Sequence, residues 1–402
     1  MLISFITKIR MPEERGVSFA IASMCKSYVD NNQKVELVIP DRKQVSALKK
    51  ANFWDYYQIK KGFYPIKKLF ALELPRIPLL ELIILHLRYL FMSWSFSIAL
   101  LYYLWSKNRR IIHLFTECKE ALILLNIARL FYEPMVIYEV HIPPQNRYED
   151  LTEKLGINRV DLLITSNHNI ADYYRRQGFP NEKIITLPNG INMEDFDFTT
   201  TKPRIRKKLS LPTDKFIVGY GGRFVTAGME KGIPELIKAM GLLIPKYPGL
   251  FLVCVGGPQE NIINYQKMLE EEEIPEAKAL FLGHVPPKTL YLYMRAFDIC
   301  AMPFPWNKHY AYTMAPLKMF EYMASGNPIL ATNLPSVREV LNDKENAIFA
   351  KPDDPRDLAD KIVFLMGHQN FARKISRRAF IDVKGEYTWK KRGKKIISAI
   401  SN

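Results

Sequence analysis

Two cations stand where this chain could hold a phosphorylated ligand. Arg223 follows glycines that close an apolar run, and Lys231 comes eight residues later, directly before Gly232. Glycine lets a ligand approach the backbone closely, and arginine pairs with phosphate oxygens through a planar fork of N–H groups. Arg223 and Lys231 could therefore flank one diphosphate, although two exposed cations in a surface loop would give the same pattern.

The segment 316–326 carries a second candidate group and is predicted to be a helix. Pro316 suits the first helical position, apolar residues recur at helical spacing, and Gly326 fits a left-handed C-terminal cap. Lys318 and Glu321 are three residues apart and share one face. With the positive end of the helix dipole they would suit a phosphorylated polyol. The alternative is an ordinary amphipathic helix with a surface ion pair.

Two single residues carry weaker signals. His141 follows an apolar run, and a histidine at the carboxyl end of a strand can face a ligand, although a lone histidine is more often packed or exposed. Gly16 opens a predicted helix, where a backbone N–H could meet a phosphate oxygen. No aspartate cluster suggests a bound metal, because Asp353 and Asp354 are better explained as a helix cap before Pro355.

Strand-like and helix-like segments alternate along the chain, a pattern typical of parallel sheets built from βαβ units. A basic stretch at 199–208 is expected to be a linker between two series of strands. The first series covers 1–8, 35–40, 111–115, 135–140, 161–166 and 184–187, and the second covers 216–221, 251–256, 279–282, 299–302 and 328–331. We therefore expect an α/β protein with two doubly wound domains facing a cleft, and ligands beyond the carboxyl ends of the strands.

The charge of the chain is positive and unevenly distributed. The 402 residues are 48% hydrophobic, enough for two cores, and carry a formal net charge of +16. Residues 56–110 contain nine Lys/Arg against two Glu (+7), and residues 371–402 contain ten against two acids (+8). Such segments attract nucleic acid, anionic lipid or phosphorylated ligands. Nucleic acid is not expected, because neither zinc-finger spacing nor an RNA-binding aromatic signature accompanies them.

The sequence predicts a cytosolic location, and peripheral contact with a membrane surface is an alternative that it leaves open. The cysteines Cys25, Cys118, Cys254 and Cys300 are far apart and fit buried thiols in a reducing compartment, and the N-terminus lacks the features of a signal peptide. Residues 89–105 lack charge over 17 positions, short of the roughly 20 that a span needs, so 82–105 is expected to be a core helix. The preceding residues 56–70 mix aromatics with lysines, which suits either an anionic bilayer surface or a solvated basic loop.

Together these segments resemble the retaining glycosyltransferases of family four, which have the GT-B fold. The resemblance follows the family's order at 161–166, 187–192, 221–232, 253–257, 283–286, 316–326 and 335–340. It implies an N-terminal acceptor-binding Rossmann-like domain over 1–195 and a C-terminal nucleotide-sugar-binding Rossmann-like domain over 196–380. The segment 387–389 and the basic last helix also resemble the family, which implies that 381–402 crosses back to the first domain.

The resemblance also implies residue roles. Arg223 and Lys231 would hold the diphosphate, Glu321 would accept hydrogen bonds from the ribose, and His141 and Gly16 would reach over from the first domain. The catalytic residues implied are Arg223, Lys231 and His141, and the donor-binding residues are Gly16, Gly222, Gly283, His284, Val285, Thr313, Met314, Ala315, Pro316, Leu317, Lys318 and Glu321. Of these, Gly283, His284 and Val285 would lie near the base.

The implied activity is that of a retaining hexosyltransferase without a metal or cofactor, because two fixed cations and a helix end could stabilise a leaving diphosphate. The donor would be a nucleotide-diphosphate sugar, and the acceptor a cell-envelope glycan, polysaccharide or lipid-linked molecule. An anionic membrane surface, contacted through 56–105, is a further candidate partner, which would place the protein at the inner face of the cell membrane.

The sequence departs from the family pattern in three places. Thr313 stands where the family motif has a glutamate, eight residues before Glu321, and that carboxylate normally addresses the donor sugar. The loop from Arg223 to Lys231 is longer than usual, and the N-terminal glycine pair is reduced to Gly16. Two alternatives follow: a non-catalytic GT-B protein that binds a nucleotide or glycan as a partner of a synthase complex, and an epimerase or phosphorylase of the same fold.

Overall fold

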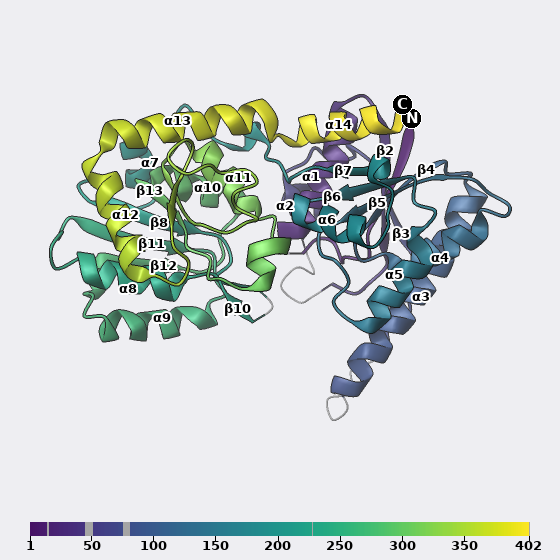
Figure 1. Ribbon diagram of the computed structural model, residues 1–402, viewed down its shortest axis with the longest axis horizontal. Coiled ribbons are helices and arrows are strands. Elements are labelled where there is room, and N and C mark those ends of the chain that lie inside the picture. The colour runs from purple at the N-terminus through teal and green to yellow at the C-terminus, as the bar shows by residue number, and fades with distance from the viewer. Residues whose placement is uncertain (14–15, 45–50, 75–80, 227, 402) are drawn as a thin grey trace. The chain divides into compact units, whose positions relative to one another are not determined.

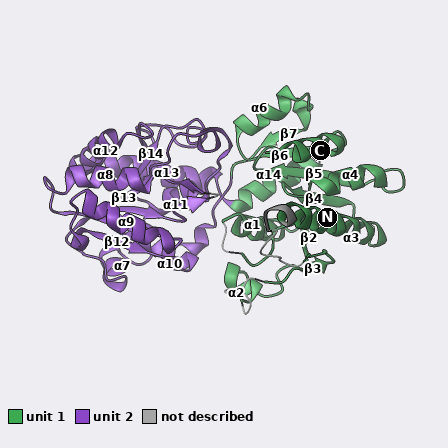
Figure 2. Ribbon diagram, turned by 90° about the horizontal axis from the view of Figure 1, so that it is seen from below, with its two compact units in different colours: residues 1–188, 389–402 green, residues 189–388 purple. Residues whose placement is uncertain are grey.

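The computed structural model describes residues 1–13, 16–44, 51–74, 81–226 and 228–401 (Figure 1). The chain folds into two compact units: unit 1 comprises residues 1–188 and 389–402, and unit 2 comprises residues 189–388 (Figure 2). The sequence analysis placed the divisions after residues 195 and 380 instead. Both segments in question fold with unit 2, because the N–H of Ile191 donates to the carbonyl oxygen of Tyr387 at 3.0 Å and Ile191 forms a β-bridge with Thr388.

Unit 1 is built on a parallel sheet of seven strands in the order β3-β2-β1-β4-β5-β6-β7. The strands are β1 (Leu2–Ile6), β2 (Lys34–Pro40), β3 (Ile66–Leu69), β4 (Ile111–Phe115), β5 (Met135–Val140), β6 (Leu162–Thr165) and β7 (Ile184–Thr186). The strand order reverses between β1 and β4, and the carboxyl ends of strands at such a switch point are the usual place for a ligand.

Helices cover the sheet of unit 1 (Figure 1). They are α1 (Gly16–Asp30), α2 (Phe53–Tyr57), α3 (Glu81–Ser106), α4 (Lys119–Ala128), α5 (Arg147–Ile157), α6 (His168–Arg176) and α14 (Trp389–Ser401), with a 3-10 turn, η3 (Asn181–Lys183). The last helix, α14, packs against α1. Helix α3 buries Met92, Phe96, Leu100 and Leu104 in the core, so the expected core helix is confirmed. None of the described helices has the length and hydropathy that crossing a membrane requires.

Unit 2 repeats this architecture with a parallel sheet of six strands in the order β12-β11-β8-β13-β14-β15. The strands are β8 (Phe216–Gly221), β11 (Leu250–Val255), β12 (Ala279–Leu282), β13 (Ile299–Met302), β14 (Ile329–Thr332) and β15 (Ile348–Ala350), and a separate antiparallel hairpin joins β9 (Val225–Thr226) to β10 (Met229–Glu230). Its helices are α7 (Lys202–Lys208), α8 (Ile233–Leu243), α9 (Glu260–Glu271), α10 (Pro287–Ala296), α11 (Leu317–Ser325), α12 (Pro355–Gly367) and α13 (Gln369–Glu386), with the short turns η4 (Met193–Asp195), η5 (Glu276–Lys278) and the π-helical η6 (His309–Thr313).

The structure corrects the sequence analysis in several places. The expected linker at 199–208 is wrong, because most of it is α7, whose Arg206 is buried and pairs with Asp298 at 2.5 Å. The strands β3 and β15 and the β9–β10 hairpin were not predicted. Strand β3 escaped notice because its two lysines make an edge strand resemble a basic loop. The cap at Asp354 is confirmed, since its carboxylate accepts a hydrogen bond from the N–H of Asp357 at 3.0 Å.

Candidate functional site

A hairpin brings Arg223 and Lys231 together beyond the carboxyl end of β8. Strands β9 and β10 pair between the two cations, and the N–H of Lys231 donates to the carbonyl oxygen of Phe224 at 3.1 Å. The loop that looked longer than usual is this hairpin. Gly232 follows in the left-handed region at φ +83°, where a Cβ would lie 1.6 Å from the carbonyl oxygen of Pro303, so only glycine fits.

Both of these cations lack a partner within the described parts of the chain. No hydrogen bond or ion pair is formed there by the exposed guanidinium of Arg223 or the half-buried ammonium of Lys231. Burial, and secondly repulsion from Arg223, lowers the pKa of Lys231 to about 8. The two side chains are therefore close enough to repel each other, and an anion between them would relieve that repulsion.

A third cation, Lys318, lies deeper in the same region. Its side chain is on the first turn of α11, the residue is only 7% exposed, and its Nζ has no hydrogen-bond partner. The Nζ lies 3.5 Å from the centroid of the Tyr220 ring, and 3.3 Å from the position that a Cβ on Gly222 would occupy. The expected alternative of a surface ion pair with Glu321 is therefore wrong, because Lys318 is inside the unit.

Burial lowers the pKa of Lys318 well below its ordinary value, and Lys231 lowers it further while Glu321 opposes both. Burying an ammonium group without an anionic partner is unfavourable, although an aromatic face recovers part of the loss. An unpaired buried cation beside two more unpaired cations is the arrangement expected of an anion-binding site that lacks its ligand.

Helix α11 begins at this cluster and confirms the predicted helix. It runs over Leu317–Ser325, and Gly326 caps its C-terminus in the left-handed conformation at φ +75°. Pro316 is the N-cap rather than the first helical residue, a shift of one position from the expectation. Burial raises the pKa of Glu321 to about 7 against the opposing charge of Lys318, so its half-buried carboxyl can accept or share a proton near neutral pH.

The π-helical turn η6 precedes α11 and contains Thr313. The Oγ1 of Thr313 lies 2.9 Å from Nδ1 of His309, within hydrogen-bonding distance. The hydroxyl of Tyr310 donates to the carbonyl oxygen of Met229 at 3.1 Å and so fastens this turn to the hairpin that carries Lys231. Burial, then Lys231, lowers the pKa of the half-buried His309. His309 was not predicted, because nothing in its sequence neighbourhood marks a lone histidine as part of a site.

The remaining residues predicted for unit 2 lie along the same edge of the sheet. Met314 and Ala315 join η6 to α11, and the amide Nδ2 of Asn189 donates to the carbonyl oxygen of Ala315 at 2.8 Å. Gly283, His284 and Val285 follow β12. A Cβ added to Gly257 would lie 3.5 Å from the backbone nitrogen of His284, so the ends of β11 and β12 are neighbours.

The other two predicted residues, His141 and Gly16, belong to unit 1. Gly16 is the first residue of α1. His141 follows β5, and its Nε2 lies 2.6 Å from Oε1 of Glu139. Arg392 donates to the same carboxylate at 2.9 Å, and Nε2 of His113 lies 2.9 Å from it. Burial opposes ionisation of Glu139, but Arg392 and the histidines hold its pKa well below the ordinary value.

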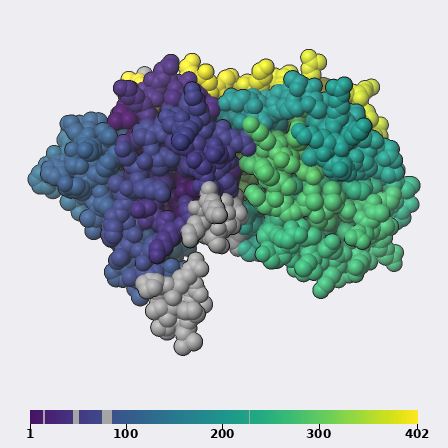
Figure 3. All heavy atoms as spheres, turned by 180° about the vertical axis from the view of Figure 1, so that it is seen from behind, coloured from purple at the N-terminus to yellow at the C-terminus, as the bar shows by residue number. Residues whose placement is uncertain are grey.

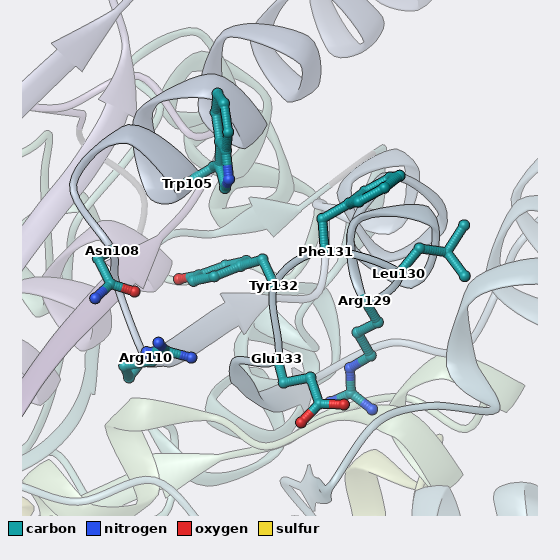
Figure 4. A pocket seen from close by; sticks show the side chains of 8 residues that line it. All are labelled: Trp105, Asn108, Arg110, Arg129, Leu130, Phe131, Tyr132 and Glu133. Carbon is teal, nitrogen blue, oxygen red and sulfur yellow. The ribbon is translucent and has the colours of Figure 1, made fainter.

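Unit 1 also contains an open hollow of about 540 Å³ (Figure 4). It lies between the end of α3 and the segment that follows α4, and it is lined by Trp105, Asn108, Arg110, Arg129, Leu130, Phe131, Tyr132 and Glu133. Arg129 pairs with Asp161 at 2.5 Å, so one of its two cations is already neutralised. Across the described ranges of both units, no group of three or more His, Cys, Asp or Glu residues is placed to hold a metal ion.

Two protein families match consecutive parts of the chain. The family described as Glycosyltransferase Family 4 matches residues 15–195. The family described as Glycosyl transferases group 1 matches residues 201–381, which include the cation cluster, η6 and α11.

Two curated relatives match part of the chain at low sequence identity. A D-inositol 3-phosphate glycosyltransferase of Corynebacterium urealyticum is 25% identical over 267 residues, which are 64% of this chain and 60% of that protein. The uncharacterized glycosyltransferase MJ1607 of Methanocaldococcus jannaschii is 24% identical over 216 residues, 52% of each chain. The chain thus spans between about half and 60% of the length of these two relatives.

Solved structures match over the full length. HepE (Alr3699) of Anabaena, in complex with UDP, has a TM-score of 0.73 at 16% identity and covers 100% of both chains. WaaG, a glycosyltransferase involved in lipopolysaccharide biosynthesis, has a TM-score of 0.68 at 11% identity and also covers 100% of both chains. At these identities the likeness shows the fold, which is GT-B with two parallel-sheet Rossmann-like domains.

Proposed function

The chain belongs to the group 1 glycosyltransferases of family four, and on this premise we propose that it transfers a sugar from a nucleotide-diphosphate donor with retention of the anomeric configuration and without a metal ion. The acceptor proposed is a cell-envelope glycan, polysaccharide or lipid-linked molecule. UDP is the first nucleotide to test, because the HepE structure that shares this fold contains it.

One observation carries this proposal: Arg223, Lys231 and Lys318 are close together and none of them has an anionic partner in the described part of unit 2. A diphosphate would supply that partner. Charge-assisted hydrogen bonds to it from Arg223 and Lys231 would be about twice as strong as neutral ones. The start of α11 would add backbone N–H groups and the positive end of a helix dipole.

The same groups explain how the reaction could proceed. When the bond from the anomeric carbon to the diphosphate breaks, negative charge grows on the leaving oxygen. Cations fixed in advance stabilise that charge without reorganising, which lowers the barrier. In the proposed retaining mechanism the acceptor oxygen attacks from the face that the diphosphate leaves. The carboxyl of Glu321 would hold the ribose hydroxyls, while His141 and Gly16 of unit 1 would address the sugar and the phosphate.

The decisive test is nucleotide-sugar turnover in two single variants. We expect Arg223→Ala and Lys231→Ala each to lower the transfer rate at least about tenfold, because each loses a charge-assisted contact to the leaving group. The exposed Lys238 of α8 offers a matched control, and Lys238→Ala should retain the wild-type rate. Full turnover in the Arg223 and Lys231 variants would refute the roles proposed for these cations. Binding of UDP without transfer to any acceptor would instead favour the non-catalytic alternative.

We further propose that unit 1 contacts an anionic membrane through residues 56–105. In this segment Lys60, Lys61, Lys67 and Lys68 are exposed, as is Phe70. The face of α3 opposite the core is apolar and open to solvent, with Tyr102 69% exposed, and Phe131 beyond α4 is 84% exposed. In Figure 3 the blue atoms at the left edge belong to the residues from about position 100 onwards, and the indigo atoms of the earlier residues lie to their right. Exposed aromatics beside lysines and arginines suit a lipid surface with negative head groups.

Vesicle flotation tests the membrane proposal. The protein should float with anionic vesicles and not with neutral ones, and reversing the charge of all four lysines should abolish flotation. Trp105→Ser with Phe131→Ser should weaken it as well, since both remove apolar area from the surface. Equal flotation with neutral vesicles, or a second copy of the chain covering the α3 face in solution, would contradict the proposal.

A further inference from the structure

Two histidines of unit 1 face the same buried carboxylate but differ at their second ring nitrogen. Nε2 of His113 lies 2.9 Å from Oε2 of Glu139, and its Nδ1 lies 2.7 Å from the hydroxyl of Tyr28. Nε2 of His141 lies 2.6 Å from Oε1 of Glu139, and its Nδ1 has no hydrogen-bond partner among the described residues. The side chain of His113 is 0% exposed, whereas that of His141 is 16% exposed. The fold therefore uses both nitrogens of His113 and leaves one nitrogen of His141 for a ligand.

The carboxylate of Glu139 decides which nitrogen of His141 carries the proton. Arg392 of α14 pairs with both of its oxygens, through Nη2 at 2.9 Å and Nη1 at 3.3 Å, and both residues are buried. A carboxylate paired in this way is ionised and can only accept hydrogen bonds. Nε2 of His141 must therefore be an N–H, and in a neutral imidazole the other nitrogen, Nδ1, is then an acceptor.

The guanidinium of Arg392 is itself fixed, so the carboxylate is held in place. Its Nε donates to the carbonyl oxygen of Pro188 at 3.1 Å, and its Nη2 also donates to that of Leu187 at 3.4 Å. The ring of His141 packs against that of Phe115 at the end of β4, with the centroids 4.8 Å apart. These contacts hold the imidazole in one orientation at the carboxyl end of β5, one strand from the switch point between β1 and β4.

From this geometry we propose that Glu139 and Arg392 are positioning residues that fix the tautomer of His141 and present its Nδ1 as a hydrogen-bond acceptor to a hydroxyl group of the donor sugar. The inference rests on the proposed function, in which His141 addresses the sugar, and deepens it by naming the atom and the kind of hydrogen bond. Arg392 acts through Glu139 and touches no substrate, so the last helix contributes to the site through the orientation of one imidazole.

Nuclear magnetic resonance of the full chain with isotope-labelled histidine tests the tautomer directly, and His141→Gln assigns the signals. At about pH 8, where an ordinary histidine is neutral, we expect His141 to carry its proton on Nε2. UDP-glucose should shift the Nδ1 signal of His141 and UDP should not, and neither should shift that of His113, which is bonded to Tyr28. GDP-mannose and GDP cover a guanine donor. A proton on Nδ1 of His141, or sugar nucleotides that bind without moving its signal, would overturn the inference.

Glu139→Gln should loosen the tautomer, because an amide can also donate to Nε2 and leave the proton on Nδ1. By calorimetry we expect the affinity for UDP-glucose to fall about three- to tenfold, as one neutral hydrogen bond contributes, and that for UDP, which lacks the sugar, to stay within about twofold. Because Arg392 is then buried without its partner, thermal unfolding shows whether the variant has folded. Glu139→Gln with Arg392→Gln removes both charges and should give the same change, whereas Lys394→Gln on the exposed side of α14 should give none.

The outcomes distinguish this inference from the proposed function. If the folded variants keep the wild-type ratio of UDP-glucose to UDP affinity, or keep the tautomer of His141, then Glu139 and Arg392 are not positioning residues, and the glycosyltransferase assignment stands. An equal loss of affinity for UDP and UDP-glucose would indicate damage to the fold and would also count against the inference. If UDP, GDP and both sugar nucleotides fail to bind the wild type, the proposed function fails, and the role of Nδ1 at the sugar fails with it.

Discussion

Each unit buries a lysine near the carboxyl end of its sheet, but Lys8 of unit 1 has a carboxylate partner and Lys318 of unit 2 has none. Lys8 follows β1 and is 3% exposed, and its Nζ lies 2.5 Å from Oε2 of Glu120, which is 1% exposed. Ser93 accepts a second hydrogen bond from the same Nζ at 3.0 Å. Burial alone would lower the pKa of Lys8, yet Glu120 raises it above the ordinary value. In unit 2, Lys318 has no such partner, and its pKa falls.

The presence or absence of a carboxylate partner separates buried charges that stabilise the fold from buried charges that are available to bind a ligand. Removing one member of a buried ion pair lowers stability strongly, because the remaining charge stays buried without an opposite charge beside it. A buried cation without a partner is already uncompensated, so removing it should not harm the fold, and it persists only where something else requires it. The two lysines therefore make opposite predictions for stability and for binding.

Lys8→Met should have the largest effect on stability. It leaves Glu120 buried beside the hydroxyl of Tyr148, and we expect the free energy of unfolding to fall by about 3–5 kcal/mol. Urea unfolding followed by circular dichroism would measure it. Lys154→Met, which breaks a solvent-exposed pair with Asp150, should leave the free energy of unfolding almost unchanged. Adding Glu120→Leu to Lys8→Met should recover most of the loss; an unrecovered loss would mean that packing, not charge, is responsible.

Lys318→Met should separate stability from binding. Its melting temperature should equal or exceed that of the wild type, while its affinity for UDP should fall about tenfold or more, the loss of one charge-assisted contact. Thermal unfolding and calorimetry would measure the two quantities, with Lys238→Met as the exposed control. A large drop in melting temperature with unchanged UDP affinity would place Lys318 with the structural charges of unit 1.

The pH dependence of donor binding should show the titration of the Lys231 ammonium group. Its pKa of about 8 in the free protein must rise when an anion binds, because the anion favours the charged form. Below pH 8 Lys231 is protonated in both states and contributes no slope. As the pH rises through 8, binding must take up a proton, so the affinity should fall by up to about tenfold per pH unit. Calorimetry with a nucleotide sugar from pH 7 to 9 would show this, and Lys231→Met should bind weakly with a flatter profile.

Tyr310→Phe should have the smallest effect. It removes the hydrogen bond to the carbonyl oxygen of Met229 that fastens η6 to the hairpin, which contributes about 0.5–1.5 kcal/mol. We expect a small loss of stability and a few-fold rise in the Kd for UDP, since Lys231 is then held less firmly. Tyr312→Phe, at an exposed position of the same turn, should change neither. Equal effects of the two substitutions would show that the turn does not position Lys231.

Several parts of this protein could be predicted because their signals are local. The apolar runs of β5 and β8, the glycine cap of α11 and the aspartate cap of α12 depend on residues within a few positions of one another. The stretch that became α7 was misjudged because its charges suggest solvent, whereas Asp298, far away in sequence, pairs with Arg206 inside unit 2. Similarly, β9 and β10 have two residues each, which is too short for a pattern that would predict the hairpin.

The sequence by itself determined the alternation of strands and helices, the two sheets that follow from it, and the residue types that could bind a phosphate. Hydrophobic periodicity and backbone preferences are local properties, so the order of residues is enough to predict them. Only the tertiary structure decided which charges have partners. That Lys8 has Glu120, that Lys318 has only an aromatic face, and that His309 joins Thr313 beside Lys231 depend on distances between segments that no local pattern encodes.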